Sequence, residues 1–228
     1  LGTVRAKVSR PLSGRLLSVT VSCDTAGRYF ASFLCTDVSV APAPETDAEV
    51  GIDLGVETLA TLSDGTKIDN PRHFKKYERK LAREQRRLSR RKGAHRGEKP
   101  SGRYLKQRKR VAKIHANIAD ARTDALHKVT SMLADENQVL CMEELSAKGM
   151  VRNHYLAKAV SDASFGEFAR MLEYKCSERG RTLVKVGRFY PSSKNCSACG
   201  HRLEALPLSI RSWNCPSCGA YHDRDVNA

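Results

Sequence analysis

Residues 196–200 read CSACG and residues 215–219 read CPSCG, so that two C-x-x-C pairs stand with fifteen residues between them. This spacing is typical of a zinc ribbon, in which each pair brings two thiolates to one ion from a tight turn. The glycine after each pair suits the unusual backbone of such a turn. Four thiolates at about 2.3 Å close the coordination shell, which predicts a structural and not a catalytic zinc. The predicted ligands are Cys196, Cys199, Cys215 and Cys218.

Three carboxylates that are far apart in the sequence form a second candidate site. Asp53 lies in GIDLG, Glu143 follows the apolar run VLCM, and Asp225 lies in HDRDVNA after the second cysteine pair. A carboxylate in an apolar run is costly unless it is paired or binds a cation. Magnesium prefers oxygen ligands, and two ions about 4 Å apart can support phosphodiester hydrolysis. Glu144 and Asp223 stay open as alternatives to Glu143 and Asp225.

The positive charge is concentrated in one segment. The chain has a formal net charge of +15, and residues 72–113 carry 19 Lys or Arg against 3 acidic residues, which leaves 21 against 22 elsewhere. Clusters of this kind displace counterions from phosphate backbones, so the segment predicts a nucleic-acid partner. A solvated helix face is the simpler alternative. The candidate phosphate contacts are Lys76, Arg79, Lys80, Arg83, Arg86, Arg87, Arg90, Arg91, Arg103, Arg108, Lys109 and Arg110.

Apolar spacing predicts the main helices and strands. Helices are predicted over 74–92 and 104–134, as an antiparallel hairpin that is apolar inside and basic outside, with a break over 93–102. A third helix is predicted over 162–179, with Gly180 as its stop signal. Alternating or apolar runs predict strands over 2–9, 15–23, 28–38, 50–55, 58–62, a short stretch after 65, 138–142 and 182–186.

Composition favours a folded protein of the cell interior. Hydrophobic residues make up 40% of the chain and charged residues 29%. The four remaining cysteines lie singly in apolar segments, which favours a reducing cytosol with a metal site over a disulfide framework. No apolar run approaches the roughly 20 residues that a membrane span needs, and no secretion signal is recognisable. We therefore expect a cytoplasmic protein with no membrane partner.

In order along the chain, GIDLG (51–55), CMEELSAKGM (141–150), the two cysteine pairs and HDRDVNA (222–228) resemble the motifs of the OrfB/TnpB family. These transposon-encoded proteins, also called transposases, are related to type V CRISPR effector nucleases. The resemblance implies an α/β fold: an RNase H-like (RuvC-type) mixed sheet with a basic helical hairpin, an inserted zinc ribbon and an N-terminal β-barrel remnant.

The same resemblance implies a function and its catalytic residues. The family's activity would be cleavage of target DNA directed by a guide RNA, in a nucleoid-associated, prokaryotic setting. Asp53, Glu143 and Asp225 match the three catalytic carboxylates, which would hold two magnesium ions. The implied domains are a partial β-barrel over 1–40, a linker over 41–49, a nuclease domain over 50–190 with its hairpin at 72–134, the zinc ribbon over 191–221 and a third nuclease motif over 222–228.

Two further expectations concern completeness and rival functions. The chain begins inside strand-like sequence and stops at the start of an expected helix, so we expect a piece of a longer protein that cleaves poorly alone. A sugar-kinase or chaperone-type ATPase can also carry GIDLG in a phosphate loop, but Glu57 would repel a phosphate there. A non-catalytic nucleic-acid-binding relative also stays open, although the presence of all three carboxylates disfavours it.

Overall fold

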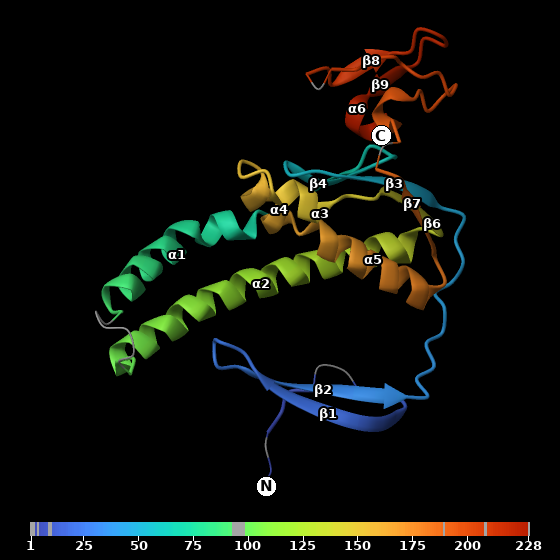
Figure 1. Cartoon of the computed structure of the whole chain (residues 1–228). Coiled ribbons are helices and arrows are strands. Elements are labelled where there is room, and N and C mark those ends of the chain that lie inside the picture. The colour runs from blue at the N-terminus through green and yellow to red at the C-terminus, as the bar shows by residue number, and fades with distance from the viewer. Residues whose placement is uncertain are drawn as a thin grey trace. The chain divides into compact units, whose positions relative to one another are not determined.

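The chain folds as two compact units (Figure 1). One unit combines Leu1–Ala41 with Lys80–Ala116, and the other combines Pro42–Arg79 with Asn117–Ala228. In this computed structural model the described residues are 3, 5–8, 11–92, 99–188, 190–207 and 209–227. Most of the predicted break over 93–102 therefore lies outside the described residues, as does Ala228.

A five-stranded mixed sheet forms the core of the second unit, in the order β5-β4-β3-β6-β7. β3 pairs antiparallel with β4, and β4 pairs antiparallel with β5. β6 lies parallel between β3 and β7, although it follows β5 by about seventy residues of chain. The strand bounds are β3 Glu49–Leu54, β4 Thr58–Leu62, β5 Lys67–Asp69, β6 Val139–Glu143 and β7 Thr182–Val186. The five predicted strands of this region are confirmed.

The two central strands bury alternate residues. Val50 and Ile52 of β3 and Leu140 and Met142 of β6 are at most 6% exposed. Because successive side chains of a strand point to opposite faces, the residues between them point to the other face. The buried face packs on the helices of this unit, through the cluster Leu126, Leu133, Phe165, Phe168, Met171, Leu172 and Cys176.

The predicted helix over 162–179 is wrong at its start, because two helices occupy this stretch. α4 (Ala157–Ala163) ends at Ser164, whose φ of 56° is left-handed, and α5 (Phe165–Arg179) begins directly after it. A left-handed residue interrupts the backbone ladder of a helix, so the chain turns there. Gly180, with φ of 68°, ends α5 as predicted. In the described ranges, no helix combines the length and the apolar character that a membrane span requires.

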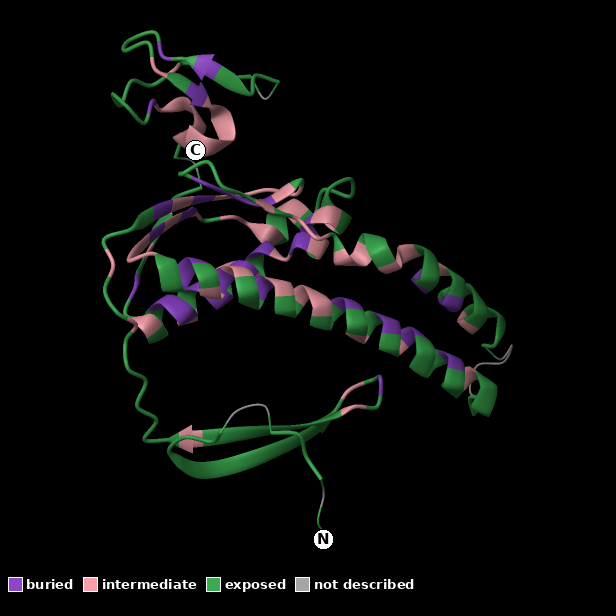
Figure 2. Cartoon of the chain, turned by 180° about the vertical axis from the view of Figure 1, so that it is seen from behind, coloured by how far each residue is buried: buried purple, intermediate pink, exposed green. Residues whose placement is uncertain are grey.

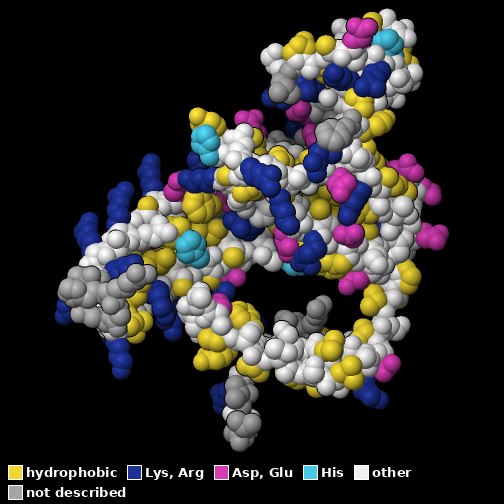
Figure 3. All heavy atoms as spheres, in the orientation of Figure 1, with side chains coloured by type: hydrophobic (Ala, Val, Ile, Leu, Met, Phe, Trp, Pro, Cys, Tyr) yellow, Lys and Arg dark blue, Asp and Glu magenta, His cyan; other side chains and the backbone are white. Residues whose placement is uncertain are grey.

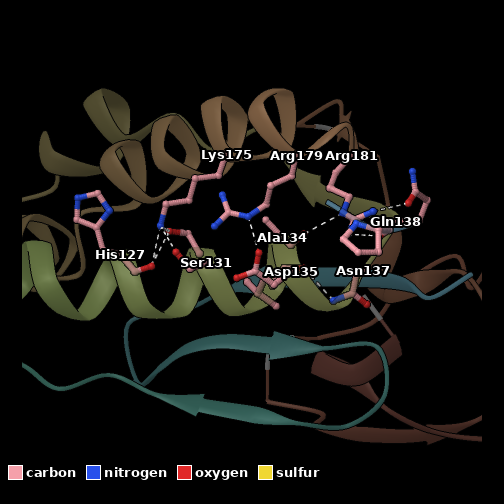
Figure 4. Close-up of polar contacts among 12 residues, drawn as sticks. His127, Ser131, Ala134, Asp135, Asn137, Gln138, Lys175, Arg179 and Arg181 are labelled. Carbon is pink, nitrogen blue, oxygen red and sulfur yellow. Dashed lines mark hydrogen bonds and ion pairs between the residues drawn. The ribbon is translucent and has the colours of Figure 1, made fainter. Parts of the chain in front are cut away.

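Buried cations fix α5 to the last turns of α2 (Gly102–Glu136), as Figure 4 shows. The Lys175 ammonium donates to the His127 carbonyl at 2.7 Å and to the hydroxyls of Thr130 and Ser131 at 2.8 Å. Burial lowers the pKa of Lys175, although its three donors find acceptors. Arg181, just after α5, donates to three further oxygens of the same unit. These hydrogen bonds join α5 and Arg181 to the end of α2.

In the first unit, a buried polar cluster joins α1 (His73–Arg90) to α2. Gln107 has no exposed surface and donates to the carbonyl oxygen of Glu84 at 3.1 Å and to its carboxylate at 2.7 Å. Arg91 donates to the Gln107 side-chain oxygen at 2.9 Å. The Gln107 hydrogen bond lowers the pKa of Glu84. The predicted hairpin is confirmed as apolar inside at the buried residues Leu81, Val111 and Ile114.

The first unit also contains an antiparallel β-hairpin of β1 (Arg15–Cys23) and β2 (Tyr29–Thr36). The predicted strand over 2–9 is wrong for its described residues 3 and 5–8, which are exposed and form no strand. A strand needs a neighbour to pair its backbone groups, and these residues have none among the described ranges. Large apolar residues of both strands are exposed, and the two strands are mostly green, the colour of exposed residues, in Figure 2. The β-barrel over 1–40 therefore stays a prediction.

Candidate functional site

Asp53 and Glu143 occupy matching ends of neighbouring parallel strands. Ile52 of β3 stands opposite Met142 of β6, so the next residues along the two strands are Asp53 and Glu143. Both point away from the buried helical face, because they alternate with the buried residues before them. Two acids separated by ninety positions are thus brought together by strand pairing alone.

Asp225 is the third acidic group that acts on this position. Burial, then the negative charges of Glu143 and Asp225, raise the pKa of Asp53 from its ordinary 3.8 to about 6. The Arg224 guanidinium opposes the shift without cancelling it. A carboxylate whose pKa is raised by two other carboxylates marks a concentration of negative charge that a cation would relieve.

The structure separates the alternative acids at both positions. Asp223, the last residue of β9 (Tyr221–Asp223), accepts the backbone N–H groups of Asp225 and Val226 at 3.0 and 3.2 Å. It therefore caps the short helix α6 (Arg224–Asn227), whereas Asp225 acts on Asp53. Glu144 is exposed, whereas Glu143 is half-buried beside Asp53.

Two polar side chains that the sequence analysis did not single out hold these acids in place. Ser192 donates its hydroxyl to Glu143 Oε1 at 2.7 Å. Asn227 donates to the Asn195 carbonyl at 2.6 Å and accepts the Ser197 N–H at 3.1 Å. The helix that carries the third carboxylate is therefore hydrogen-bonded to the loop that opens the first cysteine pair. Asn227 lies two residues after Asp225 in the motif HDRDVNA, so its place in that motif could have marked it as a supporting residue. No feature of the sequence marks Ser192.

The four predicted cysteine ligands come together. Their Sγ atoms all lie within 4.8 Å of one another, with Cys196 to Cys218 and Cys199 to Cys215 each at 3.6 Å. The glycines after the two pairs, Gly200 and Gly219, have φ of 75° and 76°, as their predicted role requires. In the described part of the chain, no other group of three or more potential ligands is this compact.

The surroundings of the sulfurs fit a metal. Cys196 and Cys215 are 2% exposed and pack against Trp213 and Leu206 in a small core of their own. Burial raises the pKa of Cys215, but hydrogen bonds from backbone and thiol neighbours outweigh it and lower that pKa to about 6. At Cys218 a backbone hydrogen bond is outweighed by hydrogen bonds among the thiols, which raise the pKa of that residue. N–H groups directed at a sulfur favour its thiolate form, which is the form that binds zinc. The cluster is compatible with a zinc ribbon.

Comparison with known families identifies the chain. The family described as "OrfB_IS605: Probable transposase" matches residues 33–154, and the "Cas12f1-like, TNB domain" matches residues 165–228. The chain belongs to the OrfB_IS605 family. The resemblance to OrfB/TnpB proteins that the motifs indicated is confirmed.

Two relatives and one solved structure extend this finding. A Streptomyces pristinaespiralis protein named "Putative RNA-guided DNA endonuclease" is 48% identical over 222 residues, which cover 96% of this chain and 53% of the relative. "Putative RNA-guided DNA endonuclease InsQ" of Escherichia coli (strain K12) is 32% identical over 242 residues, covering 100% and 58%. The chain spans a little over half the length of both relatives. The Cas12f1–sgRNA–target DNA complex, at 17% identity and a TM-score of 0.50, covers 92% of this chain and 54% of that one, and shows a similar fold.

In this OrfB_IS605 chain, the basic residues predicted to contact phosphate are all exposed, and dark blue side chains follow α1 in Figure 3. Part of their charge is already used inside the hairpin. Arg83 and Arg87 lie 3.4 and 2.8 Å from Glu84, and Arg91 is bonded to Gln107. The predicted basic outer face is confirmed, but these three arginines also stabilise the hairpin.

Proposed function

We propose that the full-length protein containing this chain is an RNA-guided DNA endonuclease, and that Asp53, Glu143 and Asp225 are its catalytic carboxylates. The observation that carries the proposal is the convergence of the acids: the pairing of β3 with β6 places Asp53 beside Glu143, and burial with the charges of Glu143 and Asp225 raises the pKa of Asp53 to about 6. At neutral pH such a group is mostly ionised although its surroundings disfavour the charge, and a bound cation would relieve that cost. Relatives named as RNA-guided DNA endonucleases support the wider reading.

The topology of the sheet supports a ligand site at this position. From β3 the chain leaves on one side to β4 and β5, and it returns on the other side to β6 and β7. In open α/β sheets, ligands bind outside the carboxyl ends of strands where the order reverses in this way. Asp53 and Glu143 lie at these ends of β3 and β6. We propose that this mixed sheet is the RuvC-type, RNase H-like sheet that the family resemblance implies.

The donor set suits two magnesium ions, which we propose Asp53, Glu143 and Asp225 hold. All three side chains offer hard oxygen ligands, and the pKa of Asp53 stays raised although Arg224 opposes the shift and Asp225 pairs with Arg211 at 3.6 Å. Bound magnesium would activate water and neutralise charge on the phosphate. The Ser192 hydroxyl occupies one lone pair of Glu143 Oε1 and so fixes the orientation of that carboxylate. Asp223, by capping α6, fixes the direction in which Asp225 leaves the chain.

We propose that Cys196, Cys199, Cys215 and Cys218 bind one structural zinc ion. The compact, partly buried sulfurs and the left-handed glycines support this role. Because Asn227 connects the first cysteine loop to α6, the zinc would also position Asp225.

The exposed basic face of α1 and α2 is proposed to track the sugar–phosphate backbone of guide RNA and target DNA. Contacts of Lys and Arg to phosphate fix register without reading bases. Arg86 and Arg90 are suited to this role, since the hairpin's buried polar cluster uses Arg83, Arg87 and Arg91 instead.

Reversing the charge of Arg86 and Arg90 should flatten the salt dependence of nucleic-acid binding. Each phosphate that the protein no longer neutralises lowers the slope of log K against log salt by about 0.7 to 0.9, so the slope of the double variant Arg86→Glu, Arg90→Glu should fall by about 1.5. Filter binding of a duplex to full-length protein across salt concentrations measures the slope. The matched variant Arg86→Lys, Arg90→Lys keeps the charge and should keep the slope. An unaltered slope in the reversed variant would reduce these residues to a solvated face.

The nuclease proposal is tested with full-length protein, its locus-derived RNA and a supercoiled plasmid complementary to that RNA. We expect linearisation in magnesium and none in a chelator. A plasmid without the complementary stretch is the control and should stay supercoiled. Cutting that ignores complementarity would contradict guidance by RNA, and binding without any cutting would favour the non-catalytic alternative.

A further inference from the structure

A cavity of about 360 Å³ opens in the second unit beside the turn between β3 and β4. Its floor is apolar, with Val56, Phe74 and Ala159 among the lining residues. Arg72, Lys75 and Tyr155 line it as well. A concave site with an apolar floor and a few polar groups is the usual form of a ligand pocket.

Several charges of the cavity are neutralised within the protein. Lys158 forms an ion pair with Glu78. Asp162 accepts the Phe74 N–H at 3.0 Å and lies 3.3 Å from the Arg122 guanidinium. Among the described residues, the lining charges without an ion pair are then two cations, Arg72 and Lys75, and one acid, Glu57. The cavity therefore offers both an anion-binding and a hydrogen-bond-accepting group.

Arg72 is held in a backbone conformation that L-residues rarely adopt. Its φ is 46°, in the left-handed region. Asn70 maintains this turn, because its side-chain oxygen accepts the Arg72 N–H at 3.1 Å and its amide donates to the Val56 carbonyl at 2.8 Å. Strained residues that neighbours hold in place are concentrated at ligand sites. The hydrogen bonds of Asn70 therefore maintain the strained backbone that keeps Arg72 at the cavity.

Tyr155 presents an aromatic surface at the same cavity. It is 83% exposed, and its ring centroid lies 3.8 Å from that of His154, with the two rings tilted by 39°. Exposed aromatic rings next to cations are the stacking platforms on which proteins hold unpaired bases. A core role does not explain an aromatic side chain with this exposure.

We propose that this cavity holds one unstacked base of the DNA strand that is led to Asp53 for cutting. The proposal rests on the nuclease function proposed above. Val56 lies three residues after Asp53, so their Cα atoms are at most about 11 Å apart, roughly three stacked nucleotides. Tyr155 stacks on the base, and Arg72 and Lys75 contact its flanking phosphates.

Glu57 gives the cavity a preference among bases. Its carboxylate can accept a hydrogen bond from the exocyclic amino group of adenine, cytosine or guanine, whereas thymine offers only its single ring N3–H. Thymine at this position should therefore be cut more slowly, and Glu57→Gln should weaken the discrimination.

The test combines a protein variant with an abasic site in the DNA substrate. Full-length protein with its RNA cuts strands in which one nucleotide at a time, within three of the cut, lacks its base. Tyr155→Ala should slow single-turnover cutting about tenfold, and the missing base at one position should slow the wild type by a similar factor. Combined, the two losses should not multiply at that position, because both remove the same contact. Tyr155→Phe keeps the ring and should keep the rate, and Arg72→Asn, which tolerates a left-handed backbone, should lose several-fold.

The same comparison can be made with dissociation constants for DNA, in protein that also carries Asp53→Asn. This measurement needs no cutting, and it therefore separates the two proposals. Coupling between Tyr155→Ala and the missing base in these dissociation constants supports the cavity proposal, even if the wild type cuts no DNA. A wild type that cuts no DNA would contradict the nuclease proposal alone. Losses that multiply at every position would overturn the cavity assignment, as would Tyr155→Ala behaving as wild type. Coupling only to bases missing from the guide RNA would overturn it too, because the occupant would then be RNA.

Discussion

An Asp53→Asn variant is expected to lose DNA cutting by a factor on the order of a thousand or more, and yet to be more stable than the wild type without divalent metal. Asparagine keeps the shape of the side chain but removes the charge that Glu143 and Asp225 repel. The same repulsion that destabilises the metal-free protein is what a divalent cation would relieve. Loss of function and gain of stability should therefore come from one substitution.

The gain in stability should depend on pH in a defined direction. The pKa of Asp53 is raised to about 6 in the folded protein, against 3.8 ordinarily, so the folded state binds this proton more tightly. The contribution of Asp53 to stability is therefore fully present below about pH 4 and is lost as the pH rises through about 6. The displacement corresponds to about 3 kcal/mol. In a chelator, the variant should match the wild type near pH 4 and exceed it above pH 6.

Thermal unfolding followed by circular dichroism measures this difference. At neutral pH, about 3 kcal/mol corresponds to a Tm higher by roughly 6–10 °C for a chain of this size. Magnesium should then raise the Tm of the wild type and leave that of Asp53→Asn unchanged. Glu144→Gln, at the exposed neighbour of Glu143, is the matched control and should change neither cutting nor the pH profile. A variant that still cuts, or that keeps the wild-type pH dependence, would remove Asp53 from the site.

The sequence predicts those features of the site that depend on one strand alone. Asp53 and Glu143 each follow buried residues of an apolar run, and the two-residue period then fixes the face on which they lie. The cysteine spacing determined the metal cluster in the same local way. The convergence of the acids needed the pairing of β3 with β6, which spacing alone does not state.

The remaining features depend on contacts between distant residues or on weak local preferences. Ser192 meets Glu143 only because β7 carries the chain back past β6, and a serine has no sequence signal for that. The break at Ser164 lacks a glycine or a proline; its left-handed backbone is supported by a hydrogen bond from its own hydroxyl to the Ser161 carbonyl. The expected strand over 2–9 had a suitable pattern but found no partner among the described residues.

The arrangement of the four-cysteine cluster would make the proposed zinc and the third carboxylate interdependent. β9 joins the second cysteine pair directly to α6, and Asn227 joins α6 to the first pair. Two of the three proposed catalytic acids stand on the sheet, whereas Asp225 stands on this short helix of four residues. The position of α6 therefore depends on the residues that it contacts. α6 contacts β9, the turn Ser192–Lys194 and β4, and Asn227 bonds it to the loop of the first cysteine pair.

Cys199→Ser is therefore expected to release the zinc, unfold the ribbon and abolish cutting, although it touches none of the carboxylates. Cys199 is exposed, so serine in its place loses almost no packing, and any large effect must come from the metal. A structural zinc contributes about 10–16 kcal/mol of binding free energy, far more than the ribbon's few buried residues supply. Trp213, the single tryptophan of the chain and 8% exposed, should report the loss as a red-shifted emission.

In Cys199→Ser, the zinc content measured by mass spectrometry should fall from one zinc per chain to nearly none, and DNA cutting should fall with it. The wild type and Asp53→Asn should both keep their zinc. Cys23→Ser replaces another exposed cysteine, outside the ribbon, and should change neither zinc nor fluorescence. If Cys199→Ser keeps its zinc, the ligand set is wrong. If it loses the zinc but cuts normally, the ribbon does not position Asp225, because an acid on an unfolded helix cannot stay beside Asp53 and Glu143.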